Sequence, residues 1–223
     1  MDPRYARNVP ALTVEECRLL AHKRVLIVGC GGLGGHLVEL LARVGVGFIR
    51  AVDGDVFEFS NLNRQLLSEM PYLGLSKAHA AADRVSRINP HVQVEARHCY
   101  LNEDNAQQLV SGCDVVLDAL DNVESRRILA AECERQKVPY IYGAISGWVA
   151  QAAVSLPGDK LIDTLFPEGI AIRDKSVLSF TPAMCASMQA ALCIKLLTGR
   201  PVENGTIYYF DLLNQEFEAI CLA

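Results

Sequence analysis

A glycine pattern near the N-terminus constrains the fold of this chain more than any other feature of its sequence. Gly29, Gly31 and Gly34 form the pattern G-x-G-x-x-G. The apolar run 25–28 precedes this pattern, and leucines at helical spacing follow it. The sequence therefore predicts a strand, a tight turn and a helix. Glycines in such a turn let the backbone approach a phosphate, which the free N–H groups of the helix N-terminus bind.

Predicted strands and helices continue to alternate as far as residue 144. Strands are predicted at 25–28, 48–52, 92–94, 114–118 and 140–144, and helices at 14–22, after the glycine turn, at 77–88, from about 102 and at 125–136. This alternation favours a doubly wound, Rossmann-like and mostly parallel α/β sheet, whose ligands sit beyond the carboxyl ends of the strands.

The pattern changes in the last third of the chain. A strand is predicted at 148–156, no regular period is visible over 157–180, Thr181 and Pro182 are expected to open a helix, and 207–213 with 217–222 are typical of a hairpin. No linker rich in Pro, Gly or Ser divides the chain. We therefore expect one domain over residues 1–223, with a nucleotide-binding half at 1–145 and a mixed, antiparallel half at 146–223.

The charge balance and the cysteines limit the partners and the compartment. The 21 Lys and Arg against 26 Asp and Glu give a net charge of −5, so there is no overall basic field for nucleic acid or an anionic membrane. The N-terminus lacks the apolar run of a secretory signal, and no uninterrupted apolar stretch reaches the ~18 residues of a membrane span. The eight cysteines include no C-x-x-C pair. A reduced, cytoplasmic setting is therefore expected.

A second set of polar residues indicates which nucleotide the glycine turn binds. Asp53 ends the second predicted strand about 20 residues after the last glycine, where an acid that binds a ribose is expected. This spacing alone would suggest NAD. However, Asn61, Asn63, Arg64 and Gln65 crowd the following loop, and Lys77 begins the next helix. The roughly four negative charges of ATP are usually met by Lys, Arg and a divalent ion, so the loop favours ATP.

With these motifs the chain resembles the adenylyltransferases of the ThiF/MoeB/HesA family, which are relatives of the adenylation domains of ubiquitin-activating enzymes. The resemblance covers nearly the whole chain. The matching stretches are 4–8, 25–35, 53–55, 60–65, 74–77, 87–90 and 118–122.

The resemblance implies an activity and a set of site residues. Family members use ATP to adenylate the C-terminal glycine carboxylate of a ubiquitin-like sulfur-carrier protein that ends in Gly-Gly, and they release pyrophosphate. The implied nucleotide-binding residues are Gly29, Gly31, Gly32, Gly34, Asp53, Asp55, Asn61, Asn63, Arg64, Gln65, Lys77, Asp121 and Asn122, with Asp121 holding Mg²⁺. The implied catalytic residues are Arg7, Arg64, Lys77 and Asp121.

The chemistry of the reaction agrees with such a set. A C-terminal carboxylate has a pKa of about 3.3–3.7 and is already a nucleophile at neutral pH, so no general base is required. The protein has to bring two anions together and stabilise the charge on the departing pyrophosphate. In the family an N-terminal arginine enters the neighbouring subunit's ATP site, and Arg7 matches that position. A homodimer is therefore expected.

The cysteines depart from the family pattern. Many relatives hold a structural zinc ion with two C-x-x-C pairs, so zinc is not expected here. Many also carry a reactive cysteine ahead of the last long helix, but the stretch 161–180 has none. Cys185 lies near the predicted start of that helix among apolar neighbours, and we expect it to be a buried structural thiol. The chemistry is therefore expected to stop at the acyl-adenylate.

Other interpretations of the same residues remain open. Asp121 could cap the helix that follows it, and Arg7 could lie in a solvated N-terminal tail. Two other functions are also compatible with a nucleotide site. One is activation of a small carboxylate, such as dehydration of threonylcarbamoyladenosine in tRNA, and the other is a nucleotide-binding module without catalysis.

Overall fold

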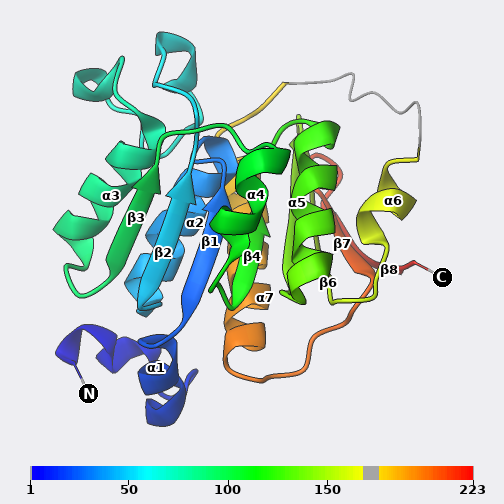
Figure 1. Ribbon diagram of the computed structural model, residues 1–223, viewed down its shortest axis with the longest axis horizontal. Helices are drawn as coiled ribbons and strands as arrows, with labels where there is room; N and C mark the ends of the chain where they lie inside the picture. The colour runs from blue at the N-terminus through cyan, green and yellow to red at the C-terminus, as the bar shows by residue number, and fades with distance from the viewer. Residues whose placement is uncertain (1, 168–175, 223) are drawn as a thin grey trace.

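One eight-stranded sheet runs through the protein (Figure 1). The computed structural model describes residues 2–167 and 176–222. The strands are β1 (Arg24–Val28), β2 (Phe48–Val52), β3 (Gln93–Arg97), β4 (Val115–Asp118), β5 (Tyr140–Ser146), β6 (Val149–Ser155), β7 (Thr206–Asp211) and β8 (Glu216–Cys221). Their order is β3-β2-β1-β4-β5-β6-β7-β8, parallel from β3 to β5 and antiparallel from β5 to β8. The predicted doubly wound sheet with an antiparallel C-terminal part is confirmed.

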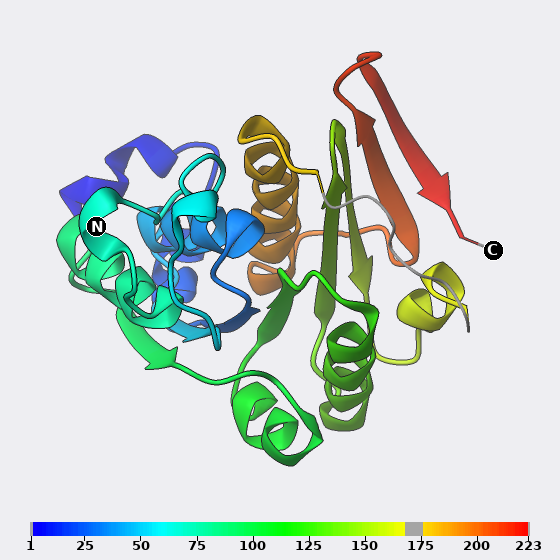
Figure 2. The same ribbon diagram turned by 90° about the horizontal axis from the view of Figure 1, so that it is seen from above.

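Helices cover both faces of the sheet (Figure 2). The α-helices are α1 (Val14–Leu20), α2 (Gly32–Val44), α3 (Lys77–Ile88), α4 (Glu103–Val110), α5 (Val123–Gln136), α6 (Leu161–Leu165) and α7 (Phe180–Leu197), and the 3-10 helices are η1 (Pro3–Asn8), η2 (Phe59–Asn61) and η3 (Met70–Tyr72). Val25 and Ile27 face the core beneath α2, α3 and α7, while Leu26 and Val28 face the core beneath α4 and α5. Strand side chains alternate in this way, so β1 is buried on both faces.

The strand order reverses between β1 and β4. In open α/β sheets, a reversal of this kind opens a crevice beyond the carboxyl ends of the strands, where ligands bind. Strands β6, β7 and β8 continue the same sheet, so both halves of the described chain share one sheet. The division of the chain into domains stays a prediction.

The second half contains the main differences from the sequence-based expectations. The helix predicted near Thr181 is present as α7, but it begins at Phe180 after the N-cap Ser179, so the expectation that Thr181 is its N-cap is wrong. The hydroxyl of Thr181 donates instead to the backbone oxygen of Gly147, at 2.8 Å. Because a tertiary contact uses this hydroxyl, local capping rules did not apply. The short helix α6 lies where no period was visible, and residues 168–175 of that stretch lie outside the described part.

Helix α7 is long and apolar enough to cross a membrane, judged by length and composition alone. A core helix of a water-soluble protein passes the same test. Half of its 18-residue apolar window is buried inside the fold, and the helix packs on α2, β5 and β6. Its apolar character is explained by these contacts.

The glycine turn depends on a close approach of three backbone segments. Gly29 has a φ of +94°, and a Cβ there would lie 2.5 Å from the backbone oxygen of Ala119 at the end of β4. A Cβ on Gly34 in α2 would lie 1.7 Å from the backbone oxygen of Gly29. Only glycine fits at these two positions, because any side chain would push α2 and β4 away from the turn.

Replacement of Gly34 by alanine tests this close approach. The added methyl group has no space, and overpacking of this kind costs about 1–3 kcal/mol. We therefore expect Gly34→Ala to lower the free energy of unfolding by about that amount in urea denaturation. Gly32→Ala is the matched control, since a Cβ there would have Pro182 at an ordinary 3.6 Å. Equal stability of the two variants would contradict the steric argument.

Candidate active site

A cavity of about 350 Å³ opens at the carboxyl ends of β1, β2 and β4. Its volume lies in the range of small-molecule sites, about 300–1,000 Å³. The reversal of strand order between β1 and β4 is therefore accompanied by a pocket of this size. The sequence-predicted residues that line it are Gly29, Gly31, Gly32, Asp53, Asp55, Arg64, Gln65, Lys77, Asp121 and Asn122. The other residues used below that line it are Cys99, Tyr100, Ser125 and Arg126.

Asp53 joins the end of β2 to the glycine turn. Its Oδ2 accepts a hydrogen bond from the backbone N–H of Cys30, at 2.7 Å, and its Oδ1 accepts one from the N–H of Asp55, at 2.8 Å. Burial raises the pKa of Asp53, although both hydrogen bonds act in the opposite direction. Each carboxylate oxygen can still accept a further hydrogen bond, so Asp53 can serve a ligand hydroxyl while it holds the turn.

Lys77 is a buried cation in the cavity wall. The residue is 6% exposed, and its Nζ lies 2.9 Å from Oδ2 of Asp55. The hydroxyl of Tyr100 donates to the other oxygen of Asp55, at 2.6 Å. The bond from Tyr100, followed by those from Lys77, lowers the pKa of Asp55. Asp55 therefore holds the side chain of Lys77 in place, and no sequence motif pointed to Tyr100.

The loop between β2 and α3 brings only part of the predicted set to the cavity. Arg64 and Gln65 line it, whereas Asn61 and Asn63 are absent from its lining. Asn61 is buried, and its Oδ1 accepts from the backbone N–H of Glu58, at 3.0 Å. Asn63 instead accepts a hydrogen bond from Arg64, at 3.0 Å. These two asparagines shape the loop and orient Arg64. Gly34 is likewise absent from the lining.

Gln65 leaves an unused polar atom in the cavity wall. Its Oε1 is buried and has no hydrogen-bond partner among the residues that the structure describes. A buried polar atom without a partner is costly, and a ligand that supplies a hydrogen removes this cost. The side chain lies beside Gly31, so such a ligand group would sit next to the glycine turn.

Asp121 and Asn122 have different roles at the start of α5. Asn122 is the N-cap, and its side-chain oxygen accepts from the N–H of Ser125, at 2.8 Å. Asp121 is exposed and lines the cavity. The interpretation of Asp121 as the helix cap is therefore wrong, because the next residue performs that role. The carboxylate of Asp121 remains available to a ligand.

A buried ion pair lies beside this turn. Asp118 ends β4 and is fully buried, and Arg126 of α5, at 2% exposed, donates to it at 2.7 Å. Arg126 also reaches the cavity wall. Sequence analysis missed this residue. The signal that could have found it is its helical spacing with Leu129 and Cys133, which are also buried. An arginine on the buried face of a helix requires a buried acceptor.

Arg7 lies at the opposite end of the sheet from the cavity. Its helix η1 is anchored by Asn8, which donates to the backbone oxygen of Val44, and by Arg4, which donates to Asn89. Val44 and Asn89 are at the C-terminal ends of α2 and α3, while the cavity is near the helix N-termini. Figure 1 shows the same separation, with the N-terminus at the foot of the sheet. The segment is an anchored helix, so the interpretation as a solvated tail is wrong.

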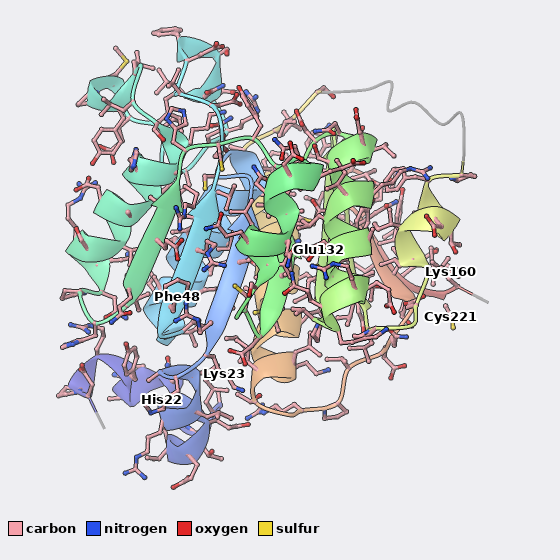
Figure 3. The ribbon with its side chains drawn as sticks, in the orientation of Figure 1. His22, Lys23, Phe48, Glu132, Lys160 and Cys221 are labelled. Carbon is pink, nitrogen blue, oxygen red and sulfur yellow. The ribbon has the colours of Figure 1, made fainter. Side chains whose placement is uncertain are left out.

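The cysteines fall into two groups. The thiol of Cys185 is buried and donates to the backbone oxygen of Gln151, at 3.2 Å, and burial raises its pKa to about 12. The predicted structural thiol is thus confirmed. Cys99 lines the cavity and is half-buried, and Cys221 is exposed on β8, at the right of Figure 3.

Comparison with known proteins agrees with this geometry. Residues 5–223 match the ThiF family. The SAMP-activating enzyme E1 of Haloferax volcanii is 36% identical over 227 residues, which covers 97% of this chain and 84% of that protein. The molybdopterin-synthase adenylyltransferase of Salmonella typhimurium is 35% identical over 229 residues, which covers 98% and 92%. The chain spans only 48–50% of some longer relatives.

A solved structure shows the same fold. The tRNA N6-threonylcarbamoyladenosine dehydratase TcdA of E. coli superimposes with a TM-score of 0.75 at 24% identity, over 88% of this chain and 94% of that chain. Identity at this level supports a shared fold and carries no information about the substrate.

Alkylation of the native protein tests the arrangement of the thiols. We expect N-ethylmaleimide near neutral pH to modify Cys99 and Cys221, because the other six cysteines are buried. Mass spectrometry of the digested protein locates the adducts, and the same treatment in guanidinium should label all eight. Rapid labelling of Cys185 in the native protein would contradict the burial described here.

Proposed function

Because the chain belongs to the ThiF family, we propose that it is an ATP-dependent adenylyltransferase that activates the C-terminal carboxylate of a ubiquitin-like sulfur-carrier protein. One observation carries the proposal. A single cavity brings together the glycine turn, Asp53, two cations and the available carboxylate of Asp121. The names of the SAMP-activating enzyme and the molybdopterin-synthase adenylyltransferase support this activity.

The described residues can share the binding of ATP. The N–H groups of the turn bind phosphate oxygens, and the carboxylate of Asp53 accepts from the ribose hydroxyls. Lys77 and Arg64 neutralise the phosphates. The net charge of the chain is −5, so this local pair of cations is what makes the cavity attractive to a polyanion.

Asp121 fits a site for Mg²⁺. Magnesium prefers oxygen ligands and is usually held by one or two carboxylates together with substrate phosphates. Residues 2–167 and 176–222 contain no group of three His, Cys, Asp or Glu placed to hold a metal, so the phosphates of the nucleotide would have to supply further ligands. A magnesium ion bound there would supply positive charge against the phosphates, and Asn122 beside Asp121 would orient its carboxylate.

The reaction needs positioning and charge compensation. A carboxylate oxygen of the carrier attacks the α-phosphorus of ATP, a new O–P bond forms, and the bond to the β-phosphate oxygen breaks. The electron pair leaves with pyrophosphate, whose charge is compensated by Arg64 and Lys77. Cys185 is buried and stays protonated at neutral pH, so we propose that the acyl-adenylate passes to a nucleophile on another protein.

We propose that the working enzyme is a homodimer in the cytoplasm. Arg7 lies far from the cavity of its own chain, so it can complete only the site of a second copy. Phe59, Met70 and Leu75 are 73%, 63% and 50% exposed on the segment that forms one cavity wall. Exposed apolar patches of this kind mark interfaces. In a two-fold dimer the same interface would cover this patch on both subunits. The expectation of a reducing compartment rests on the eight cysteines of the sequence, which include no C-x-x-C pair.

The tRNA alternative has less support. The similarity to the TcdA structure concerns the fold, whereas the names of two relatives at 36% and 35% identity describe SAMP activation and adenylation of molybdopterin synthase. The net negative charge also gives no general field for tRNA.

Exchange of labelled pyrophosphate into ATP tests the function. We expect exchange that depends on a carrier ending in Gly-Gly, and a loss of about 100-fold or more in Asp121→Ala, because a group that stabilises transition-state charge is worth that much. Asp104→Ala is the matched control, since Asp104 is exposed on α4. ATP turnover stimulated only by modified tRNA would favour the alternative, and nucleotide binding without any turnover would favour a non-catalytic module.

Mixing two inactive variants tests the contribution of Arg7. Arg7→Ala should bind ATP but lose exchange activity, because the missing group belongs to the partner's site. A mixture with Asp121→Ala should regain activity, since each mixed dimer contains one site with both residues. We expect no recovery when Asp121→Ala is mixed with Lys77→Ala, because both residues act in the site of their own subunit, so each site of a mixed dimer lacks one of them. Failure of the first mixture, with subunit exchange confirmed by mass spectrometry, would contradict the dimeric site.

A further inference from the structure

We propose that Arg126 is a positioning residue that fixes the peptide group preceding Asp121. This inference rests on the proposed function for the role of Asp121, but the contacts that carry it belong to the chain itself. Arg126 is outside the set of residues that the sequence motifs identified. It lies in the second turn of α5 and is 2% exposed.

One guanidinium joins three chain segments next to the cavity. Its NH1 donates to Oδ2 of Asp118, at 2.7 Å, and to the backbone oxygen of Gly143, at 3.0 Å. Its NH2 donates to the backbone oxygen of Leu120. The end of β4, the turn into α5 and strand β5 are therefore held by a single side chain.

Both backbone polar groups of Leu120 form hydrogen bonds to this ion pair. The N–H of Leu120 donates to Oδ1 of Asp118, at 2.8 Å, and its carbonyl oxygen accepts from Arg126. This carbonyl belongs to the peptide bond with Asp121. Because its orientation is fixed, the Cα–Cβ direction of Asp121 is also restricted, even though its carboxylate is exposed.

Asp118 is itself fixed from two further directions. The hydroxyl of Tyr140 donates to its Oδ2. The side chain of Gln189 in α7 donates to its backbone oxygen, at 2.8 Å, and to the backbone oxygen of Ile141, at 3.3 Å. The ion pair is thus connected to β5 and α7, so the turn that carries Asp121 is tied to the core.

Lysine cannot replace this arginine. The planar guanidinium reaches three acceptors in fixed directions, whereas an ammonium is a compact charge on a flexible stem. Arg126→Lys keeps the charge opposite Asp118, which avoids an unpaired buried carboxylate. The lysine ammonium remains attracted to the charge of Asp118. We therefore expect the hydrogen bond to the backbone oxygen of Leu120 to be the contact that is lost.

Hydrogen exchange of the turn gives a test that needs no ATP. We expect the amides of residues 119–122 to exchange about tenfold faster in Arg126→Lys, which corresponds to the loss of one hydrogen bond to a charged group. The amides of the glycine turn should be unchanged. Arg135→Met is the matched control, because Arg135 lies on the same helix and pairs with Glu132 at the surface.

Binding of a fluorescent ATP analogue gives the second readout. We expect Mg²⁺ to strengthen binding less in Arg126→Lys than in the wild type, by about tenfold, which is typical when the support of a metal ligand is lost. The affinity measured in EDTA should change less than twofold. A general loss of structure would weaken binding equally in both conditions.

The outcomes separate this inference from the proposed function. Wild-type exchange rates at 119–122 in Arg126→Lys would overturn the inference, as would faster exchange with a normal effect of Mg²⁺. If the wild type bound no ATP, the proposed function would fail, while the exchange experiment would still decide whether Arg126 holds the turn. If Arg126→Lys did not fold, the double variant Asp118→Asn, Arg126→Met would remove both charges of the pair together. Hydrogen exchange and nucleotide binding would then be measured on this double variant.

Discussion

The contact between the glycine turn and the end of β4 is the constraint on which the rest of the site depends. Gly29 and Gly34 have no room for a Cβ, because backbone oxygens already occupy that space. This close approach places the N-terminus of α2 beside the carboxyl end of β4, at the reversal of strand order. The cavity, the acid at the end of β2 and the turn into α5 are all positioned relative to this contact.

The charges around the cavity are of two kinds. Those of Asp118 and Arg126 are buried and paired, and they hold backbone segments together. Asp121 has an available carboxylate, and Arg64 lines the cavity from a half-buried position. Lys77 is intermediate, because it is buried but paired with an exposed acid. A buried pair costs desolvation and is retained where geometry matters, while available charges can respond to a ligand. The division therefore agrees with a rigid support beneath a site that binds a polyanion.

Much of the fold followed from the sequence, because its signals were local. The glycine turn, the apolar strands and the capping residues depend on neighbours within a few positions, so β2 and α3 were predicted with their observed limits. Local rules were wrong for Thr181, whose hydroxyl binds a distant strand turn, and for Asp121, since Asn122 caps α5. Tyr100 and Arg126 were missed for the same reason, as their partners are 45 and 8 residues away in sequence.

The sequence by itself determined the class of fold, and it carried the prediction of the ligand. Glycine spacing, an acid at a strand end and a cluster of cations are properties of residue type and order, so they predict a nucleoside triphosphate as the ligand without coordinates. Only the tertiary structure decided which of the polar residues reach the cavity, that Asn61 and Asn63 shape the loop, and that Arg7 lies at the opposite end of the sheet. These facts depend on how distant segments pack, because hydrogen bonds and steric exclusion act between neighbours in space and leave no fixed spacing in the sequence.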